Sequence, residues 1–390
     1  NKPKTTKKYT GKKTSKGDRE RKKEKDNDDF KDKETTREKR QTGSSGLKAG
    51  FADDNKQYNY FLGFLEKFKN KAPHYKLPIG ERIIIKVKDK NNKSIPNAKI
   101  AISTSGDQVA SGKTYADGSF LFFPGTISRQ KNIFQAKIKY LQRTHTLKIK
   151  RYGKRRLTLK LSVRRAAMKR IPLDIVFIFD TTGSMGEEIE RLKKTIEIIN
   201  LNLSSLSSKP RVRFGMVLYR DKEEDYRTKV IPLTSNLDKF MRELEKVEAD
   251  GGGDEPEDLQ QALKETLKSM NWKSNGIRLA FIITDAPPHL DYQQSYNYVK
   301  ASKDAKKQAI KIFSIGTGGL DIRGEYVLRQ ISQYTMGKYI FLTYGEKGEN
   351  KGGKPGSVSH HTGANWKADK LESIIIRFAK EELSHVSKQS

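Results

Sequence analysis

Apolar and polar side chains alternate strictly over residues 156–164. The apolar positions are Leu157, Leu159, Leu161 and Val163. Residues 146–150 repeat this alternation, and residues 152–154 between the two runs, Tyr-Gly-Lys, are typical of a turn. Since successive side chains of a strand point to opposite sides, the pattern predicts two strands that bury their aliphatic side chains and present their basic side chains on one solvated face.

Further strand-like runs place these two strands in a larger β-rich region. One run covers residues 82–88. The dipeptide Asp117-Gly118 is a hairpin-turn signal directly before the apolar run of residues 119–123. We therefore predict an all-β domain over residues 80–166.

The period changes after residue 171, where apolar runs of strand length alternate with segments that carry an apolar residue every three or four positions. The predicted strands are residues 175–179, 212–219, 279–284, 310–315 and 339–342. Helices are predicted between them, for example from Pro256 onward and over residues 324–334. Such alternation implies a mainly parallel sheet with helices on both faces, which is a doubly wound, Rossmann-like α/β fold.

Four further segments flank these two domains and make the chain multidomain. Residues 1–46 carry almost no aliphatic side chains, which predicts a disordered basic tail. Residues 47–79 place aromatic residues at near-helical spacing after Asp53, Asp54 and Asn55, which predicts a capped helix that docks on a neighbouring domain. A Gly-rich loop is expected over residues 345–366 and a C-terminal helix over residues 367–390.

The net charge of +32 is concentrated in one part of the chain. Residues 118–173 hold sixteen basic and no acidic groups, whereas residues 174–390 hold 33 basic and 31 acidic groups. A concentrated charge of this kind favours a polyanionic partner. The chain has no cysteine, which excludes disulfides and thiolate chemistry. No apolar run approaches the ~18 residues that a membrane helix needs, so we predict no transmembrane segment.

Candidate metal ligands follow the first predicted α/β strand. Residues 174–185 read Asp-Ile-Val-Phe-Ile-Phe-Asp-Thr-Thr-Gly-Ser-Met, so Asp180, Thr182 and Ser184 occupy alternate positions. On a loop that leaves a buried strand, this spacing directs three oxygen-bearing side chains at one point. Oxygen-only ligands suit a hard divalent cation, Mg²⁺ above all, with Mn²⁺ or Ca²⁺ as alternatives.

Two distant acids are expected at the same point. Asp285 ends another apolar strand, and ligands of doubly wound sheets lie beyond the carboxyl ends of the strands. The run of three glycines at residues 251–253 precedes Asp254 and allows a close backbone approach. Asp180, Asp254 and Asp285 are therefore predicted to converge.

These motifs resemble those of the von Willebrand factor type A domain. Asp180, Thr182 and Ser184 match the Asp-x-Ser/Thr-x-Ser element of its metal-ion-dependent adhesion site (MIDAS), and Asp285 in Ile-Ile-Thr-Asp-Ala matches its last ligand. Residues 218–221, 251–258 and 285–289 are most similar to the branch found in alpha-kinase-associated and bacterial proteins. The resemblance covers residues 172–344. It implies a Mg²⁺ that binds a carboxylate of a protein ligand, although Asp254 stands where integrin-type domains carry Thr, which leaves a purely structural ion as an alternative.

A second, looser resemblance concerns the β-rich region. The segments Ile95-Pro96-Asn97-Ala98 and 116–120 resemble those of transthyretin-like or carboxypeptidase-regulatory-like β-sandwiches. Its basic residues are the candidate polyanion ligands. They are Arg143, Lys148, Lys150, Arg151, Lys154, Arg155, Arg156, Lys160 and Arg164. Nucleic acids, teichoic-type polymers and sulfated or phosphorylated surfaces are the partners considered, but the scarcity of aromatic side chains argues against sequence-specific reading of nucleic acid. A merely solvated basic sheet is the alternative.

The function expected from these features is non-enzymatic adhesion or scaffolding, in which the Mg²⁺ site binds a protein ligand and the basic sandwich holds an anionic polymer or surface. Two alternatives stay open. One is an intracellular regulatory type A module that acts with an ATPase or kinase partner, and the other is a metal-dependent hydrolase. Because the chain starts at Asn1 rather than Met, we expect an extracellular or cell-surface location, with a cytoplasmic one as the alternative.

Overall fold

The structure is a computed structural model that describes residues 45–168, 170–252, 255–343, 358–363 and 366–387. The predicted basic tail therefore lies almost entirely outside the described residues, as do Asp254 and most of the predicted Gly-rich loop. No helix in the described ranges is both long enough and apolar enough to cross a membrane.

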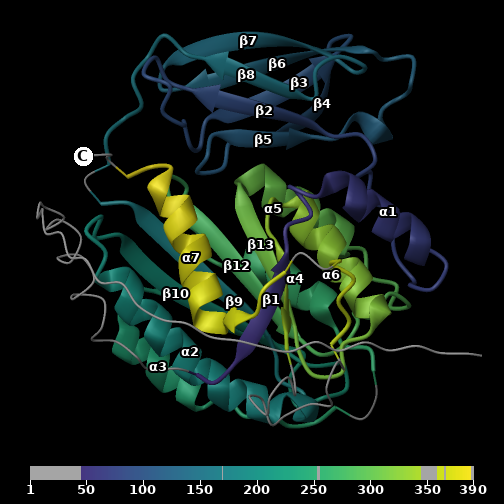
Figure 1. Cartoon of the computed structure of the whole chain (residues 1–390), viewed down its shortest axis with the longest axis vertical. Helices are drawn as coiled ribbons and strands as arrows, with labels where there is room; N and C mark the ends of the chain where they lie inside the picture. Colours follow the sequence, from purple (N-terminus) through teal and green to yellow (C-terminus); the bar gives the residue numbers. More distant parts are fainter. Residues whose placement is uncertain (1–44, 169, 253–254, 344–357, 364–365, 388–390) are drawn as a thin grey trace, which may run out of the picture. The chain divides into compact units, whose positions relative to one another are not determined.

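A sheet of eight strands organises the α/β part of the chain (Figure 1). Its order is β11-β10-β9-β12-β13-β14-β1-β15. Strands β9, β10, β12, β13 and β14 run parallel, while β11 and β1 pair antiparallel with their neighbours. The bounds are Lys48–Ala52 for β1, Pro172–Asp180 for β9, Arg211–Tyr219 for β10, Thr228–Thr234 for β11, Ile277–Thr284 for β12, Ile310–Gly316 for β13, Tyr339–Leu342 for β14 and Asp369–Lys370 for β15.

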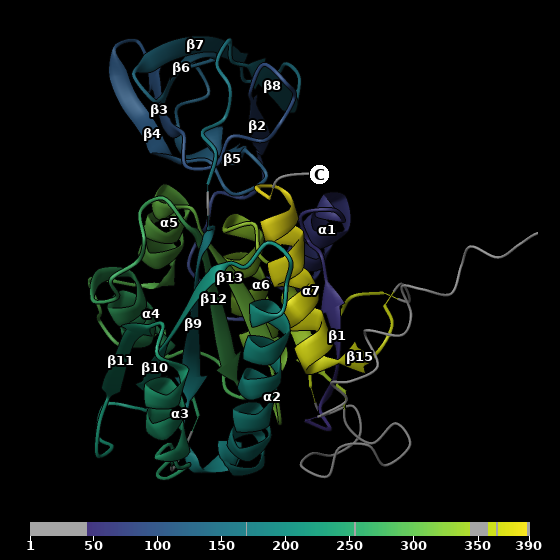
Figure 2. The same cartoon turned by 90° about the vertical axis from the view of Figure 1, so that its left-hand side faces the viewer.

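Helices cover both faces of this sheet (Figures 1 and 2). Helix α2 packs against α3 and α7, whereas α4, α5 and α6 pack against one another in series and α1 packs on α6. The bounds are Tyr58–Phe68 for α1, Gly186–Ser204 for α2, Leu237–Glu245 for α3, Leu259–Lys268 for α4, Tyr298–Gln308 for α5, Ile322–Tyr334 for α6 and Leu371–Ser384 for α7. The doubly wound α/β arrangement predicted from the alternation of strands and helices is thus present.

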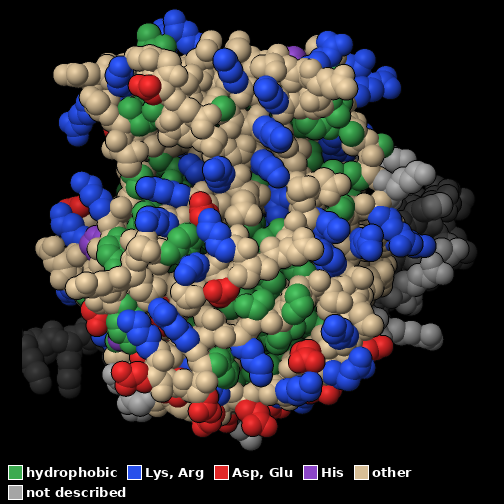
Figure 3. All heavy atoms as spheres, turned by 180° about the vertical axis from the view of Figure 1, so that it is seen from behind, with side chains coloured by type: hydrophobic (Ala, Val, Ile, Leu, Met, Phe, Trp, Pro, Cys, Tyr) green, Lys and Arg blue, Asp and Glu red, His purple; other side chains and the backbone are tan. Residues whose placement is uncertain are grey.

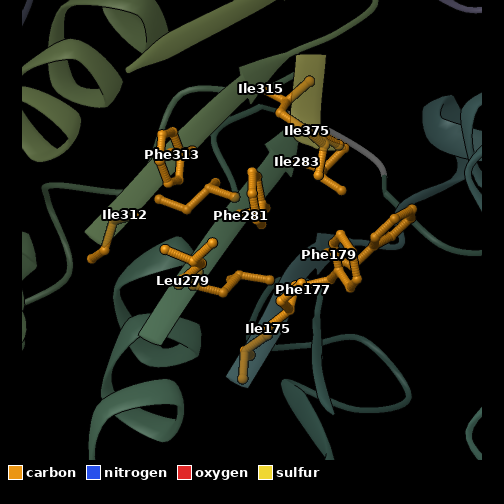
Figure 4. Close-up of a cluster of buried hydrophobic side chains, with 14 of the residues drawn as sticks. Ile175, Phe177, Phe179, Leu279, Phe281, Ile283, Ile312, Phe313, Ile315 and Ile375 are labelled. Carbon is orange, nitrogen blue, oxygen red and sulfur yellow. The ribbon is translucent and has the colours of Figure 1, made fainter. Parts of the chain in front are cut away.

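The core of the α/β part lies along the central strands, which are buried on both faces and therefore read as continuous apolar runs. Alternate residues of β9, β12 and β13 meet side chains of α7 in one cluster (Figure 4). Within it, the rings of Phe177 and Phe281 lie 5.8 Å apart and those of Phe281 and Phe313 lie 5.0 Å apart, both stacked. Phe281 is also in register with Phe177 of the parallel neighbour β9, so the two strands end at one level.

The segment after residue 46 differs from its prediction. Phe51 belongs to β1, not to a helix, because it pairs with Ile340 of β14 and its ring packs edge-to-face on Phe378. Helix α1 begins only at Tyr58, and its N-cap Gln57 makes no side-chain capping bond. The predicted cap residue Asp54 is buried instead and binds the guanidinium of Arg329 at 2.8 Å. A strand position and a buried ion pair thus override the near-helical spacing.

Residues 83–160 form two further sheets, together called the β region below. One sheet has the order β5-β2-β8 and the other β4-β3-β6-β7. Side chains of both sheets share one hydrophobic cluster, in which Phe122 and Phe134 pack edge-to-face at 5.0 Å. The bounds are Ile83–Lys88 for β2, Lys99–Thr104 for β3, Asp107–Lys113 for β4, Ser119–Phe122 for β5, Ile133–Tyr140 for β6, Arg143–Lys150 for β7 and Arg156–Lys160 for β8.

Two predictions about strand pairing in the β region are wrong. The turn at Asp117-Gly118 forms, with Gly118 at φ +77° and the Tyr115 N–H on the Ser119 carbonyl at 2.9 Å, but the strands before and after it, β4 and β5, belong to different sheets and do not pair. Likewise, β7 and β8 belong to different sheets, so their basic side chains do not share one face. Alternation reports which side chains a strand buries, but it does not report which strand lies beside it.

Candidate metal centre

Asp180 stands at the end of the central strand β9, between β10 and β12. Its carboxylate is fully buried, and both oxygens are held in place. The Thr182 hydroxyl donates to Oδ1 at 2.8 Å, and the Thr284 hydroxyl at the end of β12 donates to Oδ2 at 2.7 Å. Two neutral donors therefore orient Asp180 without neutralising it.

The loop after Asp180 is held by the glycine run. The Gly183 amide donates to the Gly251 carbonyl at 3.0 Å. A Cβ at Gly183 would lie 2.8 Å from that carbonyl oxygen, and one at Gly252 would lie 3.0 Å from Cβ of Thr182. The predicted close approach of this loop is thus present. It places the Thr182 and Ser184 hydroxyls 3.5 Å apart, with Thr182 buried and Ser184 exposed to solvent.

Asp285 follows β12, which runs parallel to β9 with Ile283 in register with Phe179. The two strands therefore end at one level, and Asp285 interacts with the Ser184 hydroxyl. Its Oδ1 is buried and has no hydrogen-bond partner among the described residues. The structure thus brings Asp180, Thr182, Ser184 and Asp285 together at one edge. Asp254 lies outside the described residues, so its role stays a prediction.

The electrostatics of this edge favour a bound cation. Burial, followed by the nearby charge of Asp285, raises the pKa of Asp180 to about 7. Burial also raises the pKa of Asp285, although the Ser184 hydroxyl opposes this shift. Within the described ranges, no Lys, Arg or His forms an ion pair with either carboxylate. Two buried acids without a positive partner are costly. Among the described residues, no group of three or more His, Cys, Asp or Glu side chains is arranged to hold a metal ion, so a cation here would depend on hydroxyl oxygens as well as on the two carboxylates.

Glu257 is a further acid of this edge that the sequence reasoning missed. Its backbone bonds to the segment after Asp285, with its N–H on the Pro287 carbonyl at 3.0 Å and its carbonyl accepting the His289 N–H at 2.9 Å. Its Oε2 is buried and unpartnered in the part of the chain that the structure describes. Burial and then the charge of Asp180 raise the pKa of Glu257 to about 9. A Glu that precedes a helix is usually interpreted as a complement to the helix dipole. The sequence alone therefore does not indicate that Glu257 is buried beside Asp180.

A small apolar cavity lies beside the same segments. It holds about 170 Å³ and is lined mainly by Pro73, Pro256, Pro287, Pro288 and Leu290. Arg323 on its wall forms an ion pair with Glu255 at 3.2 Å, and Glu255 in turn raises the pKa of Asp285. The carboxylates and an apolar hollow are thus neighbours on one edge.

The candidate polyanion residues are not all available for binding. Arg151 is almost fully buried, so its prediction as a polyanion ligand is wrong. Its guanidinium binds Glu81 at 2.8 Å and the carbonyls of Pro124, Ile127 and Ser128. Glu81 lies outside the acid-free stretch of residues 118–173, so the charge pattern of that stretch did not indicate this pairing. The other eight candidates are exposed, and they are Arg143, Lys148, Lys150, Lys154, Arg155, Arg156, Lys160 and Arg164.

Comparison with known proteins assigns the α/β part. Residues 174–344 match the family model of the von Willebrand factor A domain. Alpha-protein kinase vwkA of Dictyostelium discoideum is 33% identical over 118 residues, which is 30% of this chain and 19% of the kinase. Integrin beta-6 of Homo sapiens is 21% identical over 244 residues, which is 56% of this chain and 29% of the integrin. The chain therefore spans less than a third of the length of either relative.

Two solved structures overlap more loosely. BatB from Bacteroides thetaiotaomicron gives a TM-score of 0.38 at 15% identity over 55% of this chain and 99% of that protein. Proximal thread matrix protein 1 from the mussel byssus, in a structure with a zinc-occupied MIDAS motif, gives 0.33 at 15% identity over 42% of each chain. TM-scores this low support no conclusion about this chain, so the domain assignment depends on the family match alone.

Residues 174–344 form a von Willebrand factor A domain. The predicted resemblance of this part of the chain is confirmed. Strands β1 and β15 and helix α7, which lie outside the matched residues, complete its sheet and its helical cover. The transthyretin-like resemblance of the β region stays a prediction.

Proposed function

We propose that the A domain holds one divalent cation and uses it to bind a protein ligand that offers a carboxylate, in a non-enzymatic adhesion or scaffold role. Mg²⁺ is the favoured ion, with Mn²⁺ or Ca²⁺ as alternatives. The proposed ligands are Asp180, Thr182, Ser184 and Asp285, with the acid Glu257 near Asp180, and Asp254 is kept as a ligand predicted from the sequence. The observation that supports this most is that two buried carboxylate oxygens, Oδ1 of Asp285 and Oε2 of Glu257, find no hydrogen-bond partner among the residues that the structure describes.

The gradient of burial across the site favours ligand capture over a closed structural ion. Asp180 and Thr182 are buried, whereas Gly183 and Ser184 are exposed. An ion held by this set has the protein on one side and solvent on the other. Mg²⁺ keeps several positions for waters or outside ligands, so a partner carboxylate has a place to bind.

The surroundings indicate the kind of partner. Asp and Glu side chains gather at the lower edge of Figure 3, the end to which the parallel strands point in Figure 2. Glu224 accepts the Gly252 N–H at 2.7 Å, and Asp225 and Asp250 lie 4.0 and 3.9 Å from Arg220, whose Nε donates to the Thr181 carbonyl. Because like charges repel an incoming acid, the partner's carboxylate should be flanked by basic residues.

A displayed random-peptide library tests this function. We expect the full chain in Mg²⁺ to enrich peptides that contain Asp or Glu with neighbouring Lys or Arg, and a chelator to elute them. The matched Asp285→Asn variant should enrich none of them. Peptides that bind equally in chelator, or that keep binding after their acid is replaced by Asn or Gln, would contradict the proposal.

The similarity to an alpha-protein kinase favours one alternative partner class. In that case the same ion-dependent site acts inside the cell and binds a kinase or ATPase domain. Both versions predict capture that depends on Asp180 and Asp285, and they differ only in where the acidic ligand resides. Enriched peptide motifs that occur in a kinase or ATPase domain would select the intracellular version.

A second binding function is favoured by the outer face of the four-stranded sheet. Lys113, Lys99 and Lys139 lie in register on adjacent strands β4, β3 and β6. Lys148 and Lys150 of β7 extend this basic face. Adjacent strands are ~4.8 Å apart, and like charges directly opposite each other are destabilising. We infer that a polyanion relieves this repulsion.

Duplex DNA of arbitrary sequence serves as a probe polyanion. Its affinity should fall steeply with salt, and Lys139→Gln/Lys148→Gln/Lys150→Gln should reduce the slope of log K against log salt by about 3, because each lost phosphate contact removes ~0.9. The control is Arg156→Gln/Lys160→Gln on the other sheet, which should change the slope less. An equal loss in both variants would reassign the binding to the charge of the whole region, and no loss in either would remove the proposal.

A further inference from the structure

A cavity of about 320 Å³ lies where the β region meets helix α5. Strand β4 comes close to this helix, since a Cβ at Gly112 would be 3.0 Å from Cα of Lys307. Three lysines of α5 line the cavity, namely Lys303, Lys306 and Lys307. The aromatic part of its wall consists of Phe122, Phe123 and Tyr334. The cavity therefore combines positive charge with an apolar wall.

Lys306 is the buried lysine of the cavity wall. Only 7% of it is exposed, and among the described residues no acid lies within ion-pair distance of its ammonium. Its Nζ donates to the Leu121 carbonyl at 3.2 Å and lies 5.0 Å from the ring centre of Tyr334. The acid in the cavity lining, Asp304, is occupied by Lys268 at 2.7 Å and by the Tyr296 hydroxyl.

Lys311 provides a contrast on the neighbouring strand. It is as buried as Lys306, but it forms an ion pair with Glu382 at 2.5 Å. Burying an ammonium is costly unless an anion pairs with it, and aromatic rings and one carbonyl offset only part of this cost. Accordingly, burial and then the charge of Lys303 lower the pKa of Lys306 to about 7.

We propose that this cavity binds a small organic anion, a phosphate or carboxylate carried on a flat apolar body. The anionic group would pair with Lys306 and with Lys303 or Lys307 at the solvent-exposed side, and the apolar body would lie against Phe122, Phe123 and Tyr334. The site shares no residue with the metal centre. It therefore stands whether or not the A domain binds a cation.

Calorimetric titration of the full chain with phenyl phosphate, benzoate and inorganic phosphate tests the site. We expect phenyl phosphate and benzoate to bind in a one-to-one ratio and inorganic phosphate to bind more weakly, since it lacks the apolar body. Lys306→Met should weaken binding at least about tenfold, because charge-assisted hydrogen bonds are the stronger kind. Lys303→Gln/Lys307→Gln should weaken it to a smaller extent, and the control Lys300→Gln, on the same helix but outside the cavity lining, should not change it.

Thermal unfolding separates a binding role from a packing role. Met keeps the length of the side chain and its contact with the rings, so Lys306→Met should unfold at the same temperature as the wild type or higher. Unchanged anion affinity in Lys306→Met would show that the lysine serves only to pack the β region on α5 and would overturn the proposal. So would the absence of binding by all three probes at millimolar concentration.

Discussion

Mg²⁺ should raise the unfolding temperature of the wild-type chain, and Asp180→Asn should abolish this increase. Only the folded chain brings Asp180 and Asp285 together, so an ion that binds there shifts the folding equilibrium by mass action. At an ion concentration about 100 times Kd, the gain is ~2.7 kcal/mol. Calorimetric unfolding with Mg²⁺ and with chelator measures it. The control Asp238→Asn, an exposed acid on α3, should keep the full increase.

Without the ion, the same substitution should change the pH dependence of stability. The pKa of Asp180 is about 7 in the folded chain, compared with the ordinary aspartate value of 3.8 expected in the unfolded chain. Between these values the folded chain keeps a proton that the unfolded chain releases, so this contribution to stability is present at low pH and is lost as the pH rises toward 7. Metal-free Asp180→Asn should lack that part of the decline. Stability of the metal-free wild type that rises with pH relative to the variant would contradict the assigned environment.

Arg329→Leu should lower the free energy of unfolding by ~3–5 kcal/mol, which is the usual cost of removing one partner from a buried ion pair. Arg329 is fully buried and binds Asp54 at 2.8 Å and Glu325 at 3.0 Å. Its Nη1 also donates to the His361 carbonyl at 2.8 Å. Its loss leaves the buried Asp54 carboxylate without its cation, removes one of the partners of Glu325, which keeps Ser359 and His361, and removes a link between three segments. Urea unfolding followed by circular dichroism measures the change.

A second substitution distinguishes charge imbalance from lost packing. Arg329→Leu/Asp54→Leu removes the guanidinium together with its main partner, so the double variant should recover part of the stability that the single variant loses. If Arg329→Leu costs less than ~1 kcal/mol, the network contributes no more than an exposed pair does. If the loss of unfolding free energy in the double variant equals the sum of the losses in Arg329→Leu and Asp54→Leu, the two residues are not coupled.

The A domain could be predicted from sequence because its signals are local. Buried parallel strands are continuous apolar runs that end in ligand residues, so Asp180 and Asp285 could be placed at one edge without knowing any long-range contact. The glycines at 251–253 indicated a close backbone approach, and the described ones make it. Helix α5 and strand β11 were not predicted. Helix α5 buries few large side chains, and β11 is an edge strand, so neither has a clear apolar pattern in the sequence.

What could not be predicted depends on partners far away in the chain. Arg151 looks like any other base until Glu81 and three carbonyls surround it, and Asp54 looks like a helix cap until Arg329 binds it. The separation of β7 and β8 into different sheets is equally invisible to a period of two, because both pairings bury the same side chains. Glu257 contributes through its burial next to Asp180, and burial of a polar residue has no signature in its neighbours along the sequence.

Titration of the full chain with Mn²⁺, with the free ion followed by electron paramagnetic resonance, tests the central claim most directly. The coordination proposed for Asp180 and Asp285 predicts one bound Mn²⁺ per chain that Mg²⁺ displaces and that both Asp180→Asn and Asp285→Asn abolish. A chain that binds no ion, or one whose bound ion survives either substitution, would contradict it.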